Sequence, residues 1–151
     1  MREFAAELIG RRNRAALLLT PDLAGQCDYA ARLAASLQAQ HLDVLSHFEK
    51  DGTLLARVAM FSPDDLLALI AEHGDQPLIV VTGIEFLLGV WLSQGEPKRV
   101  KQDFCYKLEV WQQKPAFLLV THEDPVFDAY QPQRFPGTRV VLHTSETLAL
   151  T

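Results

Sequence analysis

The sequence predicts one α/β domain over residues 1–151, a three-layer αβα arrangement with a five-stranded, mostly parallel sheet. Five short apolar runs alternate with segments whose apolar residues recur at helical spacing. Such runs, apolar on both faces, are typical of parallel strands covered by helices on each side. The chain has 151 residues, 48% of them hydrophobic and 22% charged, so it can bury one sizeable core.

The strands are predicted from short runs of apolar residues. The first run follows a short N-terminal helix that is expected to end at Gly10. The sequence Leu-Ile-Val-Val after Pro77 is the most strand-like stretch of the chain. The five predicted strands cover residues 15–19, 44–48, 78–81, 116–120 and 140–142.

Helices are predicted between these strands. Ser62, followed by Pro63 and two aspartates, supplies a cap, a proline at the first helical position and acids in the first turn. The clearest amphipathic helix is expected over residues 98–113, where large apolar residues recur at spacings of four, four and three. Further helices are expected after Gly25 and over residues 84–92.

Composition limits the partners and the compartment. Fourteen basic and nineteen acidic residues give a net charge of −5. This charge argues against nucleic-acid binding over the whole surface but not against a local basic patch. Cys27 and Cys105 have no metal-ligand spacing and are expected to be reduced thiols. No secretory signal or membrane-spanning run is recognised, so a cytoplasmic location without membrane association is expected.

The segment after the first predicted strand reads Thr-Pro-Asp-Leu-Ala-Gly-Gln-Cys. It resembles the P-loop of nucleotide-hydrolysing proteins, G-x-x-x-x-G-K-[ST], which binds phosphate between a strand and a helix. Thr20 stands at the first glycine position and Gly25 at the second. Gln26 stands where the phosphate-binding lysine belongs, and Cys27 where the Mg²⁺-binding hydroxyl belongs.

These substitutions oppose triphosphate binding. Gln26 carries no charge, and Cys27 offers a soft sulfur where Mg²⁺ prefers hard oxygen. Pro21 removes one main-chain N–H, and Asp22 adds a negative charge. Each lost charge-assisted contact costs about 1.5–3 kcal/mol. We therefore expect no cofactor, and weak binding of ATP and Mg²⁺ is the alternative. The segment can also be interpreted as an ordinary turn before a helix, with no relation to a P-loop.

Two more strand ends carry candidate residues. In P-loop proteins a second strand ends in an Mg²⁺-holding Asp, often followed by a catalytic Glu, but Thr82 and Gly83 occupy these positions here. Glu85, the nearest carboxylate, is either a catalytic candidate or a residue that favours the helix dipole. Thr121 or His122 is a candidate for the position that senses the γ-phosphate in many P-loop ATPases. His122, a catalytic candidate, also resembles part of a small acid–base or metal site with Glu123 and Asp124, and a polar loop is the alternative.

Arginines form two further groups of candidates. Arg134 precedes Phe135 and the last predicted strand, and resembles the arginine finger that AAA+ ATPases insert into a neighbour's active site. The alternative for Arg134 is a solvated surface position. Arg11, Arg12 and Arg14 are weak candidates for contact with nucleic-acid phosphates, and a solvated basic face is the alternative.

The order of these motifs over about residues 15–142 is similar to the ATPase core of the RecA/AAA+ type. This resemblance implies the strand order 5-1-4-3-2, and no helical lid is expected. The small size of the chain and its short P-loop-like core also resemble the BrxF family, the small P-loop proteins of bacteriophage-exclusion (BREX) systems. That resemblance implies a bacterial defence component that acts beside a larger ATPase and a DNA methyltransferase.

The leading functional hypothesis is a pseudo-ATPase, a structural or regulatory subunit that packs against copies of itself or against an active ATPase. The first alternative is a weak ATPase or nucleotide-binding enzyme. The second is a DNA-binding adaptor that uses the N-terminal arginines.

Overall fold

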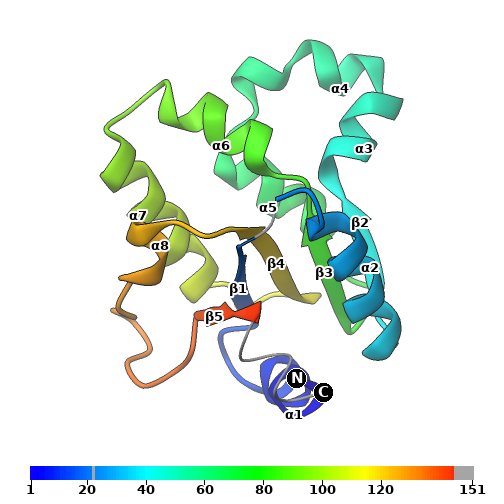
Figure 1. The fold of residues 1–151 in the computed structure, drawn as a ribbon, viewed down its shortest axis with the longest axis vertical. Coiled ribbons are helices and arrows are strands. Elements are labelled where there is room, and N and C mark those ends of the chain that lie inside the picture. Colours follow the sequence, from blue (N-terminus) through cyan, green and yellow to red (C-terminus); the bar gives the residue numbers. More distant parts are fainter. Residues whose placement is uncertain (22, 145–151) are drawn as a thin grey trace.

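The computed structural model describes residues 1–21 and 23–144 (Figure 1). Within them, five strands form one parallel sheet in the order β2-β3-β4-β1-β5. This is the order 5-1-4-3-2 read from the other edge, so the predicted fold class is confirmed. The strands are β1 (Ala15–Thr20), β2 (Gln40–Asp43), β3 (Leu78–Thr82), β4 (Ala116–His122) and β5 (Val141–His143).

Helices cover both faces of the sheet, which separates two apolar cores. Leu17 and Leu19 of β1 point into one core, whereas Ala16 and Leu18 point into the other, because successive strand residues face opposite sides. Helices α1 (Arg2–Gly10) and α2 (Gln26–Ser36) cover the Ala16 face. The Leu17 face is covered by residues of α3 (Val44–Lys50), α5 (Pro63–Ala71), α6 (Glu85–Leu92), α7 (Pro97–Glu109) and α8 (Pro125–Asp128).

The predicted start of α5 is confirmed by its capping residues, whereas the predicted end of α7 is not. The Ser62 hydroxyl accepts the Asp65 main-chain N–H, while the Asp65 carboxylate accepts the Ser62 N–H, so both residues fix the start of α5. The amphipathic helix α7 starts at Pro97, next to its cap Glu96, and ends at Glu109, four residues before the predicted end. The short helix α4 (Gly52–Ala56) and the 3₁₀ helix η1 (Val58–Met60) connect α3 to α5.

The predicted strand over residues 44–48 is wrong, because this segment forms α3. Val44 and Phe48 are fully buried at a spacing of four, which places both on the inner side of a helix. The Asp43 side chain accepts the Ser46 N–H at 3.5 Å and caps that helix. The real strand β2 lies just before it and pairs with β3 at the sheet edge, where Leu42 is its one buried residue.

Among the described residues, no helix is both long and apolar enough to cross a membrane. The same part of the chain contains no helical lid over the sheet. Both cysteines are free thiols, Cys27 exposed and Cys105 buried.

Candidate functional site

The P-loop-like segment lies at the carboxyl edge of the sheet. It leaves the interior strand β1 after Thr20 and enters α2 at Gln26 (Figure 1). Gly25 is the residue before the helix, with φ −89° and ψ 0°. This conformation does not require glycine. The strand–loop–helix junction is therefore present, whereas Asp22 lies outside the described residues.

The side chain of Gln26 is turned inward and buried. Its amide Nε2 donates to Glu85 Oε1 at 2.7 Å, and the Thr121 hydroxyl donates to the same oxygen at 3.1 Å. The Thr20 hydroxyl donates to the Thr121 carbonyl at 3.3 Å. Four of the sequence-predicted residues, from three different strand ends, thus form one hydrogen-bonded cluster. Gln26 holds a carboxylate of its own chain instead of facing an incoming phosphate.

A second polar group lies beside this cluster, at the ends of β2 and β3. The Cys27 thiol donates to Asp43 Oδ2 at 3.6 Å, and His41 Nε2 lies 2.7 Å from the Thr82 hydroxyl. Desolvation and the neighbouring Asp43 carboxylate raise the pKa of Cys27, which favours the protonated thiol over the thiolate. Burial lowers the pKa of His41 and favours its neutral form.

Asp43 and His41 are site residues that the sequence analysis missed. Their positions follow from the true strand β2, since the carboxyl ends of parallel strands meet at one edge of the sheet. Assignment of the strand to residues 44–48 hid this relationship. The signal that could have revealed it is the Asp-Val-Leu-Ser sequence, in which Asp43 is a helix cap with Ser46 three residues later.

Gln26 and Glu85 of the first cluster and Cys27, Asp43 and Thr82 of the second line a hollow of about 300 Å³ whose charge has the wrong sign for phosphate. Asp43 and Glu85 contribute carboxylates, and no lysine or arginine is among the described lining residues. Leu23, 54% exposed, and Leu45, 43% exposed, add apolar surface. A phosphate in this hollow would meet two negative groups without a compensating cation.

Gly83 shows why the catalytic Glu of P-loop ATPases has no place here. Its φ of +75° is a left-handed conformation that favours glycine. A Cβ atom at this position would lie 2.3 Å from Asp43 Oδ1 and 2.9 Å from the Leu45 nitrogen. The close approach of the β2–α3 junction therefore excludes any side chain at residue 83.

His122 and its acidic neighbours do not form one site. His122 is exposed at the end of β4, whereas Thr121 is the buried residue that reaches Glu85. Asp124 forms an ion pair with Lys101 and caps α8, and Glu123 lies 4.0 Å from His143. Across the described part of the chain, no three His, Cys, Asp or Glu side chains are grouped to hold a metal ion.

Arg134 is exposed on the segment before β5, at the amino edge of the sheet and away from the Gln26 cluster. Buried Glu109 holds this segment by accepting the main-chain N–H groups of Gln133, Arg134 and Phe135 at 2.5–2.9 Å. Tyr130 also donates its hydroxyl to Glu109, at 2.5 Å. Burial opposes ionisation, but these hydrogen bonds outweigh it and hold the pKa of Glu109 below its usual value.

The N-terminal arginines have different roles. Arg11 donates to the carbonyls of Asn13 and Arg139, and Arg14 donates to those of Arg11 and Gln112. Both guanidinium groups thus join segments of the fold. Arg12 is exposed, with its guanidinium 5.5 Å from the centre of the Phe135 ring. The structure therefore leaves Arg12 as the arginine of this group most accessible to a ligand.

Comparison with known proteins adds no relative to these observations. No family model matches the chain, and a search of the curated proteins gives no significant match.

Proposed function

We propose that this protein is a pseudo-ATPase, a P-loop-like subunit that acts in the cytoplasm as a structural or regulatory partner of a larger ATPase. A BREX-type phage-defence complex is the setting suggested by the sequence resemblance. In this role the domain retains the sheet and the strand–loop–helix junction of an ATPase, but it neither holds Mg·ATP nor activates water.

The observation that carries this proposal is the hydrogen bond from Gln26 to Glu85. The residue at the lysine position is neutral and already engaged, and the adjoining hollow contains two carboxylates and no cation among its described lining residues. A P-loop stabilises phosphate with main-chain N–H groups and one full positive charge. Removal of this charge and addition of carboxylates both oppose phosphate binding.

Calorimetric titration with Mg·ATP and Mg·ADP tests the proposal. We expect no heat of binding up to millimolar nucleotide, and no rise in the melting temperature, because a ligand stabilises a protein only when it binds the folded state. Binding in the micromolar range would overturn the pseudo-ATPase assignment and favour a nucleotide-binding enzyme.

A double variant provides a positive control for this titration. Gln26→Lys with Glu85→Gln supplies the missing cation and removes the carboxylate that would otherwise pair with it. We expect measurable diphosphate binding in this variant, whereas Glu85→Gln alone should remain without it.

Arg134 is proposed to act across an interface on the partner's ATPase site. The Glu109 contacts fix the main chain around Arg134 while its side chain remains exposed, which suits a group that must reach another protein. We expect Arg134→Ala to lower the partner's ATPase rate without weakening the complex. Arg99→Ala, an exposed arginine on α7, is the matched control. An unchanged rate in Arg134→Ala would exclude the finger role.

A further inference from the structure

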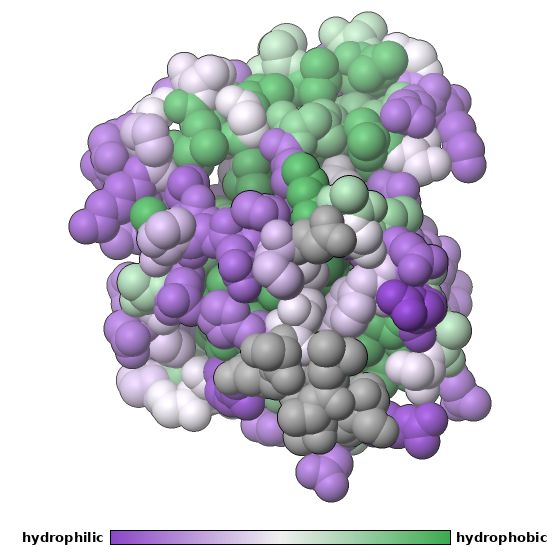
Figure 2. All heavy atoms as spheres, viewed as in Figure 1, coloured by the Kyte–Doolittle hydropathy of each residue, from purple (hydrophilic) through white to green (hydrophobic). Residues whose placement is uncertain are grey.

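The segment from α4 to η1 leaves its apolar side chains uncovered. None of the residues in these two elements is buried, whereas each of the other α-helices in the described residues buries at least one. Leu55 is 48% exposed and Met60 78% exposed. Figure 2 shows hydrophobic residues gathered over the upper part of the molecule, where Figure 1 places α4. The fold itself therefore does not use this apolar surface.

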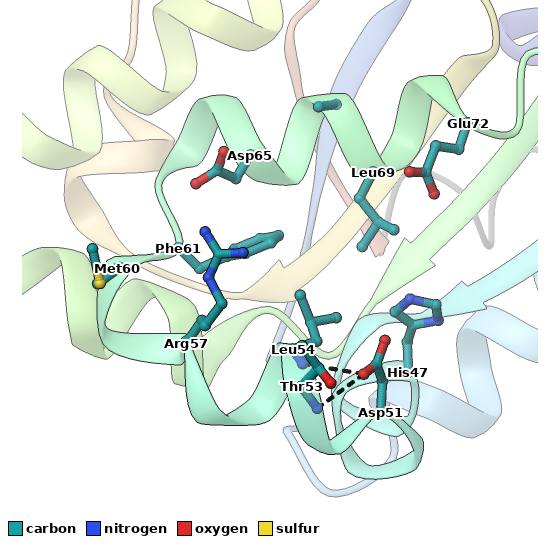
Figure 3. Close-up of a pocket in the computed structure, with 11 residues that line it drawn as sticks. His47, Asp51, Thr53, Leu54, Arg57, Met60, Phe61, Asp65, Leu69 and Glu72 are labelled. Atoms are coloured by element: carbon teal, nitrogen blue, oxygen red, sulfur yellow. Dashed lines mark hydrogen bonds between the residues drawn. The ribbon is translucent and has the colours of Figure 1, made fainter.

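A groove of about 530 Å³ runs between this segment and α5 (Figure 3). Leu54, Phe61 and Leu69 give it apolar walls. Polar groups surround these residues: three carboxylates, one guanidinium and one imidazole, from Asp51, Asp65, Glu72, Arg57 and His47. With His47 counted as neutral, three negative charges and one positive charge leave a net charge of −2 in the groove.

The carboxylates of this groove keep free acceptor capacity. Asp51 Oδ1 accepts the N–H groups of Thr53 and Leu54, and Asp65 Oδ2 accepts that of Ser62. The Glu72 carboxylate makes no hydrogen bond or ion pair with the described residues, and Figure 3 shows it directed toward the groove beside Leu69. The negative charge is therefore available to a partner.

We propose that this groove binds a basic amphipathic helix of a partner protein. Leucine-like side chains on one face of that helix would pack against Leu54, Phe61 and Leu69, as in helix-in-groove recognition. Lysine or arginine side chains at its margins would pair with Glu72 and the neighbouring aspartates. Nucleic acid is excluded by the sign of the charge, and residues 145–151 of this chain contain no lysine or arginine.

This surface goes beyond the proposed function, because it shares no lining residue with the hollow beside Gln26. Its test therefore does not depend on whether nucleotide binds.

The test uses the full chain and a fluorescein-labelled helical peptide of alanine, leucine and lysine, with leucines at helical spacing. Fluorescence anisotropy should give a dissociation constant of about 10 µM or tighter. Glu72→Arg and Met60→Ser should each weaken binding by about tenfold or more. Both residues are exposed, so circular dichroism should show unchanged folding. A peptide with glutamate in place of lysine should not bind.

Matched control variants lie on α1, which covers the other face of the sheet. Glu3→Arg repeats the charge reversal and Ile9→Ser likewise replaces an exposed apolar side chain by serine, and both should leave the affinity within about twofold of wild type. Absence of peptide binding, or equal loss in both pairs of variants, would overturn the proposal. A dimer in analytical ultracentrifugation that Met60→Ser dissociates would also overturn it, because a second copy would then cover the groove.

Discussion

At the scale of single residues, Glu109 is a buried carboxylate whose charge is stabilised by hydrogen bonds rather than by a cation. Three main-chain N–H groups and the Tyr130 hydroxyl donate to its two oxygens. No lysine or arginine forms an ion pair with it among the described residues. The side chain joins the end of α7 to the segment that carries Arg134, so one residue determines the course of that loop.

Replacement of this carboxylate by an amide tests its role. Glu109→Gln places an N–H₂ donor against main-chain N–H donors, so we expect the free energy of unfolding to fall by about 2–3 kcal/mol. Urea denaturation measures the change. Glu72→Gln, at an exposed position whose carboxylate has no partner among the described residues, should change it by less than about 0.5 kcal/mol. Equal effects of the two variants would contradict the structural role of Glu109.

At the scale of elements, the junctions after β2 and β3 approach each other too closely for a side chain at residue 83. Gly83 combines a left-handed backbone with direct contact to Asp43, the cap of α3. The two neighbouring strands therefore determine together which residue can follow β3. This packing requirement, together with the left-handed backbone, accounts for the glycine.

Two glycines in neighbouring elements give opposite predictions. Gly83→Ala should lower the free energy of unfolding by about 1–3 kcal/mol, because the new Cβ atom meets Asp43 and the backbone is strained. Gly89→Ala, on the exposed side of α6 with nothing within 4 Å, should raise it by about 0.5–1 kcal/mol. Thermal unfolding of both variants measures these shifts. A neutral Gly83→Ala would show that the close approach is not maintained in solution.

At the scale of the whole molecule, two carboxylates connect stability to pH. The pKa of Glu109 is lowered, as is that of Asp124, where the effect of burial is outweighed by hydrogen bonds from Lys101 and the Val126 N–H. Between the folded and unfolded pKa values, the unfolded chain binds more protons. The contribution of these groups is therefore complete above their unfolded pKa values of about 4 and is lost as pH falls through the folded ones.

Urea denaturation at stepped pH measures this dependence. We expect the free energy of unfolding to decline from pH 6 toward pH 3, and the decline to be shallower in Glu109→Gln because one of the two carboxylates with a lowered pKa is absent. An equal slope in the wild type and the variant would remove Glu109 from this explanation.

Apolar periodicity predicted four of the five strands and most helices, because buried strands and amphipathic helices carry their burial pattern in the sequence. The edge strand β2 was missed for the same reason, since Gln40–Asp43 buries one side chain and carries no apolar run. The P-loop-like frame correctly placed a strand-to-helix junction at the sheet edge. In that frame Gln26 and Cys27 stand at the lysine and hydroxyl positions.

The sequence by itself determined that strands and helices alternate and that the inner strands are parallel, because these features follow from the pattern of neighbouring residues along the chain. It also determined that Gln26 and Cys27, both neutral, follow Gly25 in the P-loop-like segment. Only the tertiary structure decided that Gln26 binds Glu85, that Asp43 blocks residue 83, and that α4 borders an acidic groove. These contacts join separate elements. They depend on how helices pack across the sheet, which local propensity and spacing do not specify.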